Sequence, residues 1–141
     1  MHVSCLTVVD HFDLGREVVG TCMNFVDRYL DRYIEIDLNG IGKSAFQLLA
    51  MTCLYLAVKI QEPKRFHLGV MAQLSRGSFT EAHFLDAEKK ILSLLQWNVH
   101  PPSPYEFLFY FLRILHLSSN VQQDLNKIAD QARYLIELSV I

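Results

Sequence analysis

Residues 45–61 read AFQLLAMTCLYLAVKIQ, and this stretch decides the fold of the chain. Apolar residues fill almost every position, so a helix formed here is apolar nearly all round. Such a helix is stable in water only when other helices cover most of its sides. Pro63 sets its end, because a proline disfavours helical geometry in the residue before it. The stretch therefore predicts the central helix of a bundle, with Ser44 as its N-cap.

Amphipathic helices are predicted on both sides of this central segment. Apolar residues recur at spacings of three and four over residues 16–33 and from Phe84 to Trp97, which is the pattern of helices with one apolar face. Residues 33–37 alternate briefly and predict an extended connection. A shorter helix is predicted at residues 68–74. The phrase Ser78-Phe79-Thr80-Glu81 has the spacing of a capping box for the helix that follows.

A cluster of prolines predicts the boundary between two units. Pro101, Pro102 and Pro104 form a stiff connector. Beyond it, residues 105–115 and 121–140 are again amphipathic. The total is about six helices with no convincing pair of strands, so the predicted fold class is all-α.

Composition excludes several classes of function. Of the 141 residues 51% are hydrophobic and 20% charged, and the formal net charge is −2 without a basic face, which argues against binding to nucleic acid. The longest apolar stretch, Leu48–Val58, is shorter than the ~20 residues that span a bilayer. The scattered cysteines and histidines show no metal-ligand spacing, so we expect no metal and no cofactor. Met1 to Cys5 lack a basic leader, and we expect a soluble, intracellular protein.

Four phrases, in register from about Asp10 to Leu112, resemble the cyclin family. They are FVDRYL at residues 25–30, the central helix ending in LAVKIQE at 56–62, EKKIL through LQWNV at 88–99, and PSPYEFL at 102–108. The resemblance implies a five-helix bundle around a central apolar helix. It also implies an N-terminal cyclin box at residues 1–100, with its first helix incomplete, and a linker with a partial C-terminal box at 101–141.

The resemblance implies a regulatory subunit that binds and activates a cyclin-dependent serine/threonine kinase and performs no chemistry itself. In cyclins, a lysine at the end of the third helix and a glutamate in the fifth contact the kinase, and Lys59 and Glu88 occupy those positions. Ile60, Leu85 and Leu92 are the predicted apolar contacts beside them. The family also implies a location in the nucleus, the cytoplasm or both.

Two features depart from the family pattern. The tryptophan of the first helix would fall on Ser4, and the M-R-x-x-L phrase that precedes it would lie before Met1. Gln47 therefore matches only a remnant of the patch that docks substrates. Asp27 is predicted to have a structural role, because a partly buried carboxylate needs a partner, which in the family is an arginine on the first helix.

Other interpretations stay open. A lysine in the last turn of a helix is favoured by the helix dipole alone, and Glu88 could be an ordinary exposed charge. The same box also serves as a transcription-type adaptor for other proteins, and a degenerate fragment could bind nothing. An enzyme is the remaining class. Gly42-Lys43-Ser44 matches the end of a nucleotide-binding P-loop, but Asp37 stands where its first glycine belongs. Cys53 lies in the most apolar helix and should be inert as a nucleophile.

Overall fold

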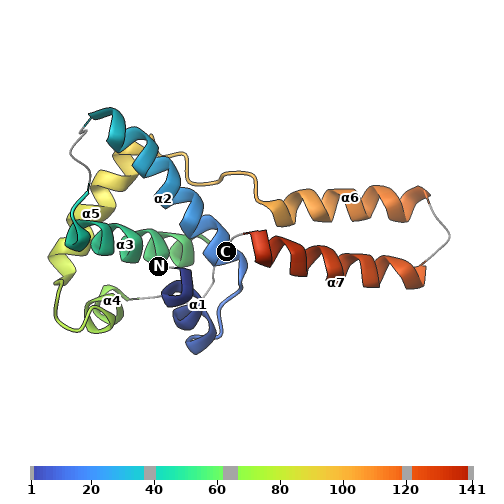
Figure 1. Cartoon of the computed structure of the whole chain (residues 1–141), viewed down its shortest axis with the longest axis horizontal. Coiled ribbons are helices and arrows are strands. Elements are labelled where there is room, and N and C mark those ends of the chain that lie inside the picture. Colours follow the sequence, from blue (N-terminus) through green and yellow to red (C-terminus); the bar gives the residue numbers. More distant parts are fainter. Residues whose placement is uncertain (1, 37–40, 62–66, 119–121, 140–141) are drawn as a thin grey trace. The chain divides into compact units, whose positions relative to one another are not determined.

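The computed structural model describes residues 2–36, 41–61, 67–118 and 122–139 of the chain (Figure 1). Within these ranges it has seven helices and no strand, which confirms the all-α class. The helices are α1 (His2–His11), α2 (Glu17–Ile36), α3 (Lys43–Gln61), α4 (Leu68–Leu74), α5 (Glu81–Leu94), α6 (Pro104–Ser118) and α7 (Gln122–Ser139).

The chain divides into two compact units, residues 1–101 and residues 102–141. In the first unit, α3 lies at the centre and packs against α2, α5 and α4, while α1 packs against α2 (Figure 1). The described helices of this unit are five in number, and the central position of the most apolar one is confirmed. The second unit is a hairpin of α6 and α7.

The hydrophobic core of the first unit forms around α3. Nine consecutive or nearly consecutive residues of this helix, from Leu49 to Val58, are buried. Phe25 on α2 and Phe84 on α5 have no exposed surface, and Met71 on α4 is 1% exposed. By length and composition α3 alone among the described helices could cross a membrane. Its buried residues account for that composition, because other helices of the bundle cover it.

Helix ends differ from the sequence-based predictions in three places. α3 begins at Lys43, and Gly42 O accepts the Phe46 N–H at 2.9 Å, so Ser44 lies in the first turn and is not the N-cap. α2 continues to Ile36, so the predicted extended connection is wrong for its first residues, and the rest lies outside the described residues.

The start of α5 also differs from the sequence-based prediction. Thr80 is the N-cap, and its backbone N–H donates to His83 Nδ1 at 3.1 Å. The predicted box of Ser78 and Glu81 is therefore wrong, because the histidine replaces the glutamate as the reciprocal partner. The helix ends at Leu94 and not at Trp97, since the residues after it take positive φ angles, 54° at Gln96 and 59° at Trp97.

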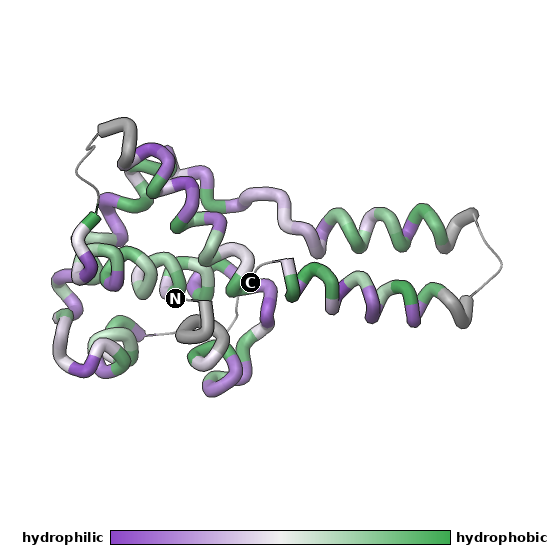
Figure 2. The backbone as a smooth tube through the Cα atoms, viewed as in Figure 1, coloured by the Kyte–Doolittle hydropathy of each residue, from purple (hydrophilic) through white to green (hydrophobic). Residues whose placement is uncertain are grey.

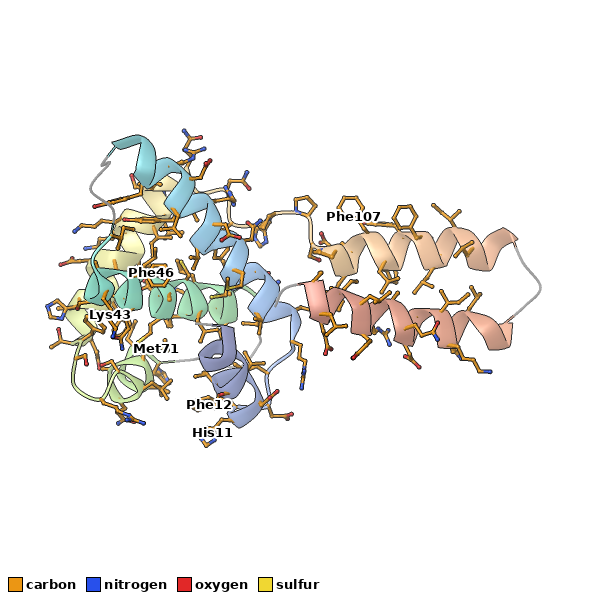
Figure 3. All side chains as sticks on the ribbon, in the orientation of Figure 1. His11, Phe12, Lys43, Phe46, Met71 and Phe107 are labelled. Atoms are coloured by element: carbon orange, nitrogen blue, oxygen red, sulfur yellow. The ribbon has the colours of Figure 1, made fainter. Side chains whose placement is uncertain are left out.

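The hairpin of the second unit carries many exposed apolar side chains. Phe109, Phe111 and Leu135 are 62%, 62% and 63% exposed. Figure 2 shows hydrophobic positions along both of its helices, and Figure 3 marks Phe107 at the start of α6. Among the residues of this unit whose side chains are described, Ala129 on α7 is the one that is buried. The hairpin therefore leaves most of its aromatic residues exposed.

Candidate functional site

An ion pair joins the two charged residues that the sequence singled out. Lys59 lies in the last turn of α3, Glu88 lies at the middle of α5, and Lys59 Nζ donates to Glu88 Oε1 at 3.0 Å. The packing of α3 against α5 brings them together from positions far apart in the chain. Glu88 is only 8% exposed, whereas the Lys59 side chain is 55% exposed. The pair thus has a buried acceptor and a cation that reaches the surface.

The surroundings of Lys59 favour its charged form. The hydrogen bond with Glu88 is the main cause that raises the Lys59 pKa above its ordinary value, and partial burial opposes it. Lys59 Nζ also lies 5.5 Å from the centre of the Tyr55 ring, within reach of a cation–π interaction. Tyr55 was not predicted from the sequence as a part of this site, although it precedes Lys59 by one helical turn.

The predicted apolar contacts surround this pair. Leu85, Glu88 and Leu92 follow one another at spacings of three and four, so they share one face of α5. Leu85 is 43% exposed, and Leu92 and Ile60 are partly buried. Leu85 and Leu92 thus flank Glu88 along α5, and Ile60 follows Lys59 on α3.

Two arginines of α2 hold the end of α5 in place. Arg32 Nη1 donates to Leu94 O at 2.9 Å, and Arg28 Nη1 donates to Asn98 O at 2.8 Å. The first bond satisfies a carbonyl group that the end of a helix leaves without a partner, and the second holds the segment that follows α5. The arginines therefore position α5, and with it Glu88. The signal that could have identified them is their spacing of four, which places both on one face of α2.

The prediction of a partly buried carboxylate at Asp27 is wrong. This residue is exposed on α2, although its neighbours Phe25 and Val26 are buried. A helix turns by about 100° per residue, so adjacent positions point in different directions. Its carboxylate stays in water and needs no buried cation to offset desolvation.

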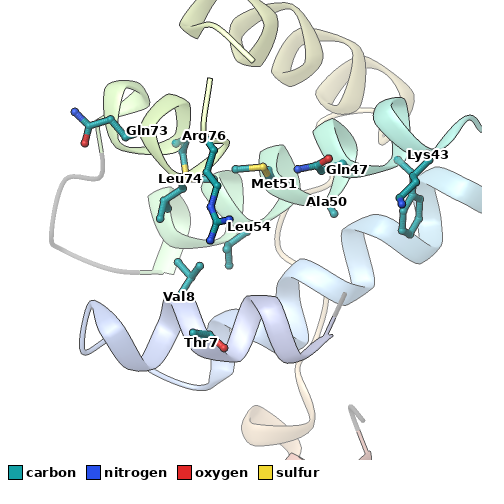
Figure 4. A pocket seen from close by; sticks show the side chains of 12 residues that line it. Thr7, Val8, Lys43, Gln47, Ala50, Met51, Leu54, Gln73, Leu74 and Arg76 are labelled. Atoms are coloured by element: carbon teal, nitrogen blue, oxygen red, sulfur yellow. The ribbon is translucent and has the colours of Figure 1, made fainter. Parts of the chain in front are cut away.

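Gln47 lines a groove on another side of the bundle, between α1, α3 and α4. The groove has a volume of about 680 Å³, and Figure 4 shows the side chains around it. Met51 and Leu54 supply its apolar floor from α3, and Val8 faces them from α1. The structure therefore places Gln47 at a surface separate from the Lys59–Glu88 pair.

The residues considered for catalysis are not arranged for it. Gly42-Lys43-Ser44 leads into α3 in a part of the chain where the described residues form no strand, so the β-α-β frame of a P-loop is absent there. Cys53 is fully buried. Among the described residues, no group of three or more His, Cys, Asp and Glu residues could hold a metal ion.

The sequence of this five-helix unit matches a known family model. The model, described as the cyclin N-terminal domain, covers residues 4–100. The chain belongs to the cyclin family. The matched residues include the helices that carry the ion pair and the groove, and the match begins within α1.

The chain is also similar in sequence to individual cyclins. The chain is 31% identical to G2/mitotic-specific cyclin-2 of Antirrhinum majus over 81% of its length, and 29% identical to Cyclin-B2-2 of Arabidopsis thaliana over 96%. It is 36% identical to G1/S-specific cyclin-E of Drosophila melanogaster over 52%. It spans 24%, 29% and 10% of the lengths of these relatives. The chain thus spans less than a third of the length of each of these relatives.

Proposed function

We propose that this chain acts as a cyclin-type regulatory subunit, which binds and activates a cyclin-dependent serine/threonine kinase and performs no catalysis of its own. The observation that carries the proposal is the Lys59–Glu88 pair at 3.0 Å, formed where α3 packs against α5. Ile60, Leu85 and Leu92 supply the proposed apolar contacts. The names of the mitotic relatives favour a role in the cell cycle, in the nucleus, the cytoplasm or both.

Activation by such a module requires no chemistry from it. A kinase is active when its C-helix glutamate pairs with the lysine that holds the ATP phosphates. A rigid helical face that fits only this arrangement stabilises it by its differential affinity. Raising the active population from about 1% to 99% requires roughly 5.5 kcal/mol of preference. Burial of apolar surface contributes on the order of 25 cal/mol per Å², so a few hundred Å² buried only in the active state would suffice.

The ion pair has a second role in this proposal, which is to fix the register of the two proteins. Because Glu88 is nearly buried and already holds Lys59, the ammonium is oriented before the kinase arrives. An oriented charge loses less side-chain entropy on binding than a free one. The remaining donor capacity of Lys59 then points toward acceptors on the partner.

Exchange of the two charges tests this proposal directly. The double variant Lys59→Glu with Glu88→Lys keeps an ion pair within the chain but reverses the polarity presented to the kinase. We expect it to remain helical by circular dichroism and to lose at least tenfold in affinity for a purified cyclin-dependent kinase, measured by surface plasmon resonance. The matched control is Lys89→Glu on the same helix, whose lysine is exposed. Unchanged kinase affinity in a folded charge-exchanged chain would contradict the proposal.

The groove lined by Gln47 is the second surface in this proposal. We assign it to the docking of substrates or other regulated proteins, on the basis of its volume, its apolar floor and its separation from the Lys59–Glu88 pair. The test is peptide binding to the free chain, compared with kinase affinity in the same variants. Loss of kinase affinity together with peptide binding would argue for a single shared surface.

A further inference from the structure

The charges around the groove define what kind of segment it accepts. Lys43 and Arg76 are the charged side chains that line it, and none of the described lining residues is an aspartate or a glutamate. Neither cation forms an ion pair with a carboxylate of the described residues. The groove therefore combines an apolar floor with a positive charge that nothing in the described part of the chain neutralises.

The two cations lie at opposite ends of the groove. Lys43 is at the start of α3, whereas Arg76 follows α4 and points toward Leu54 (Figure 4). Leu54 lies roughly 16 Å beyond Lys43 along the α3 axis, at 1.5 Å per residue. An extended chain advances about 3.3 Å per residue, so about five residues cover this distance.

The groove floor determines which residues fit in the middle of such a segment. Met51, Leu54 and Leu74 supply apolar surface between the cations, and Gln47 and Gln73 supply amides that can pair with a backbone. Methionine adapts its shape to different apolar side chains. The surface therefore suits an extended backbone with two or three apolar residues that point downward.

We infer that this groove binds an extended protein segment in which apolar residues are flanked on both sides by acidic ones, about five residues apart. The inference rests on the proposed docking role of the Gln47 groove, and it does not depend on kinase binding. The acidic residues pair with Lys43 and Arg76, and the apolar residues fill the floor over Met51. Segments with basic flanks place like charges at both ends and are rejected.

Three synthetic peptides test the charge preference on the full chain. Each has two leucines and a phenylalanine in the middle, flanked by pairs of glutamates, lysines or serines, and carries a fluorophore for polarisation measurements. We expect the glutamate peptide to bind about tenfold more tightly than the lysine peptide at low salt. The difference should shrink at 1 M salt, where the Debye length falls to about 3 Å. A fourth peptide, with serines in place of the apolar residues, should not bind.

Charge reversal in the protein supplies the matched comparison. The double variant Lys43→Glu with Arg76→Glu should invert the preference, so that the lysine peptide binds more tightly. The control reverses the exposed Lys89 and Lys90 on α5, which changes the net charge equally and should leave the preference intact. Circular dichroism establishes that both variants keep their helical content, and Lys59→Met should leave peptide binding unchanged.

Four outcomes would overturn the inference. The first two are equal binding of the lysine and glutamate peptides, and absence of binding by all peptides. The third is an unchanged preference in the folded double variant. The fourth is a dimer in sedimentation that the same double variant abolishes. The last result would identify a second copy of the chain as the occupant. Kinase affinity is measured in parallel. The kinase affinity of the Lys59→Glu, Glu88→Lys variant tests the proposed function alone. The peptide preference of the Lys43→Glu, Arg76→Glu variant tests this inference alone.

Discussion

Removal of the Lys59 ammonium should destabilise the chain although that ammonium lies partly in water. Lys59→Met keeps most of the aliphatic stem over Tyr55 but leaves the Glu88 carboxylate, in a residue only 8% exposed, without its charged donor. A buried group that loses a charged partner costs about 1–3 kcal/mol. Because the 55% exposure of the Lys59 side chain admits water to the site, we expect the lower part of that range, about 1–2 kcal/mol.

Urea unfolding followed by circular dichroism measures this cost. A loss of about 1–2 kcal/mol changes the equilibrium between folded and unfolded chains by a factor of about 5–30, and the midpoint should fall without a change in the slope. Lys89→Met on the exposed side of α5 is the control, with an expected effect within about 0.5 kcal/mol. Adding Glu88→Gln to Lys59→Met should recover part of the loss, since a neutral amide needs no cation.

The effects of Lys59→Met and Glu88→Gln on the free energy of unfolding should be coupled. If Lys59→Met and Lys89→Met destabilise equally, the ion pair contributes nothing measurable to the fold. If the effects of Lys59→Met and Glu88→Gln simply add, the two side chains act independently, which is contrary to their 3.0 Å contact. Either result would refute the account of a preoriented charge at the proposed kinase surface.

Three further predictions concern the same bundle. Phe84→Ala should cost about 3–5 kcal/mol in urea unfolding, since Phe84 is fully buried between helices. A cost near 1 kcal/mol would mean that neighbouring side chains relax into the space left by the ring. Arg32→Met should cost about 0.5–1.5 kcal/mol by the same assay, because it removes the hydrogen bond to Leu94 O. An unchanged midpoint would show that this hydrogen bond does not contribute to stability. The raised pKa of Lys59 means that its contribution is fully present below its ordinary value of 10.5 and is lost as the pH rises through the higher folded value. The stability difference between the parent chain and Lys59→Met should therefore shrink as the pH rises through that alkaline range, and a difference that grows there would contradict the sign.

Much of the candidate site could be predicted from the sequence. The phrases around Lys59 and Glu88 identified two residues far apart in the chain, and the structure brings them into direct contact. The family resemblance likewise named Leu85 and Leu92, and their spacing puts them on the same face of α5 as Glu88. Asp27 shows where this reasoning failed, because its buried neighbours suggested burial that the helix rotation does not give it.

Local sequence rules were weaker at helix ends and at the groove. Ser44 and Ser78 are good capping residues, yet the helices start at Lys43 and after Thr80. Several polar residues compete for each cap, and differences of about 1 kcal/mol decide between them. Arg76 gave no signal at all, because its place beside the groove follows from a positive φ angle of 53° after α4.

The sequence by itself determined the all-α class and the central position of α3, because a helix that is apolar nearly all round has no stable alternative in water. It also supplied the phrases that identify the cyclin family. Only the tertiary structure decided that Glu88 is buried and paired, that Asp27 stays in water, and that Lys43 and Arg76 share one groove. Burial and charge pairing depend on contacts between residues distant in the chain, and those contacts exist only after the helices pack.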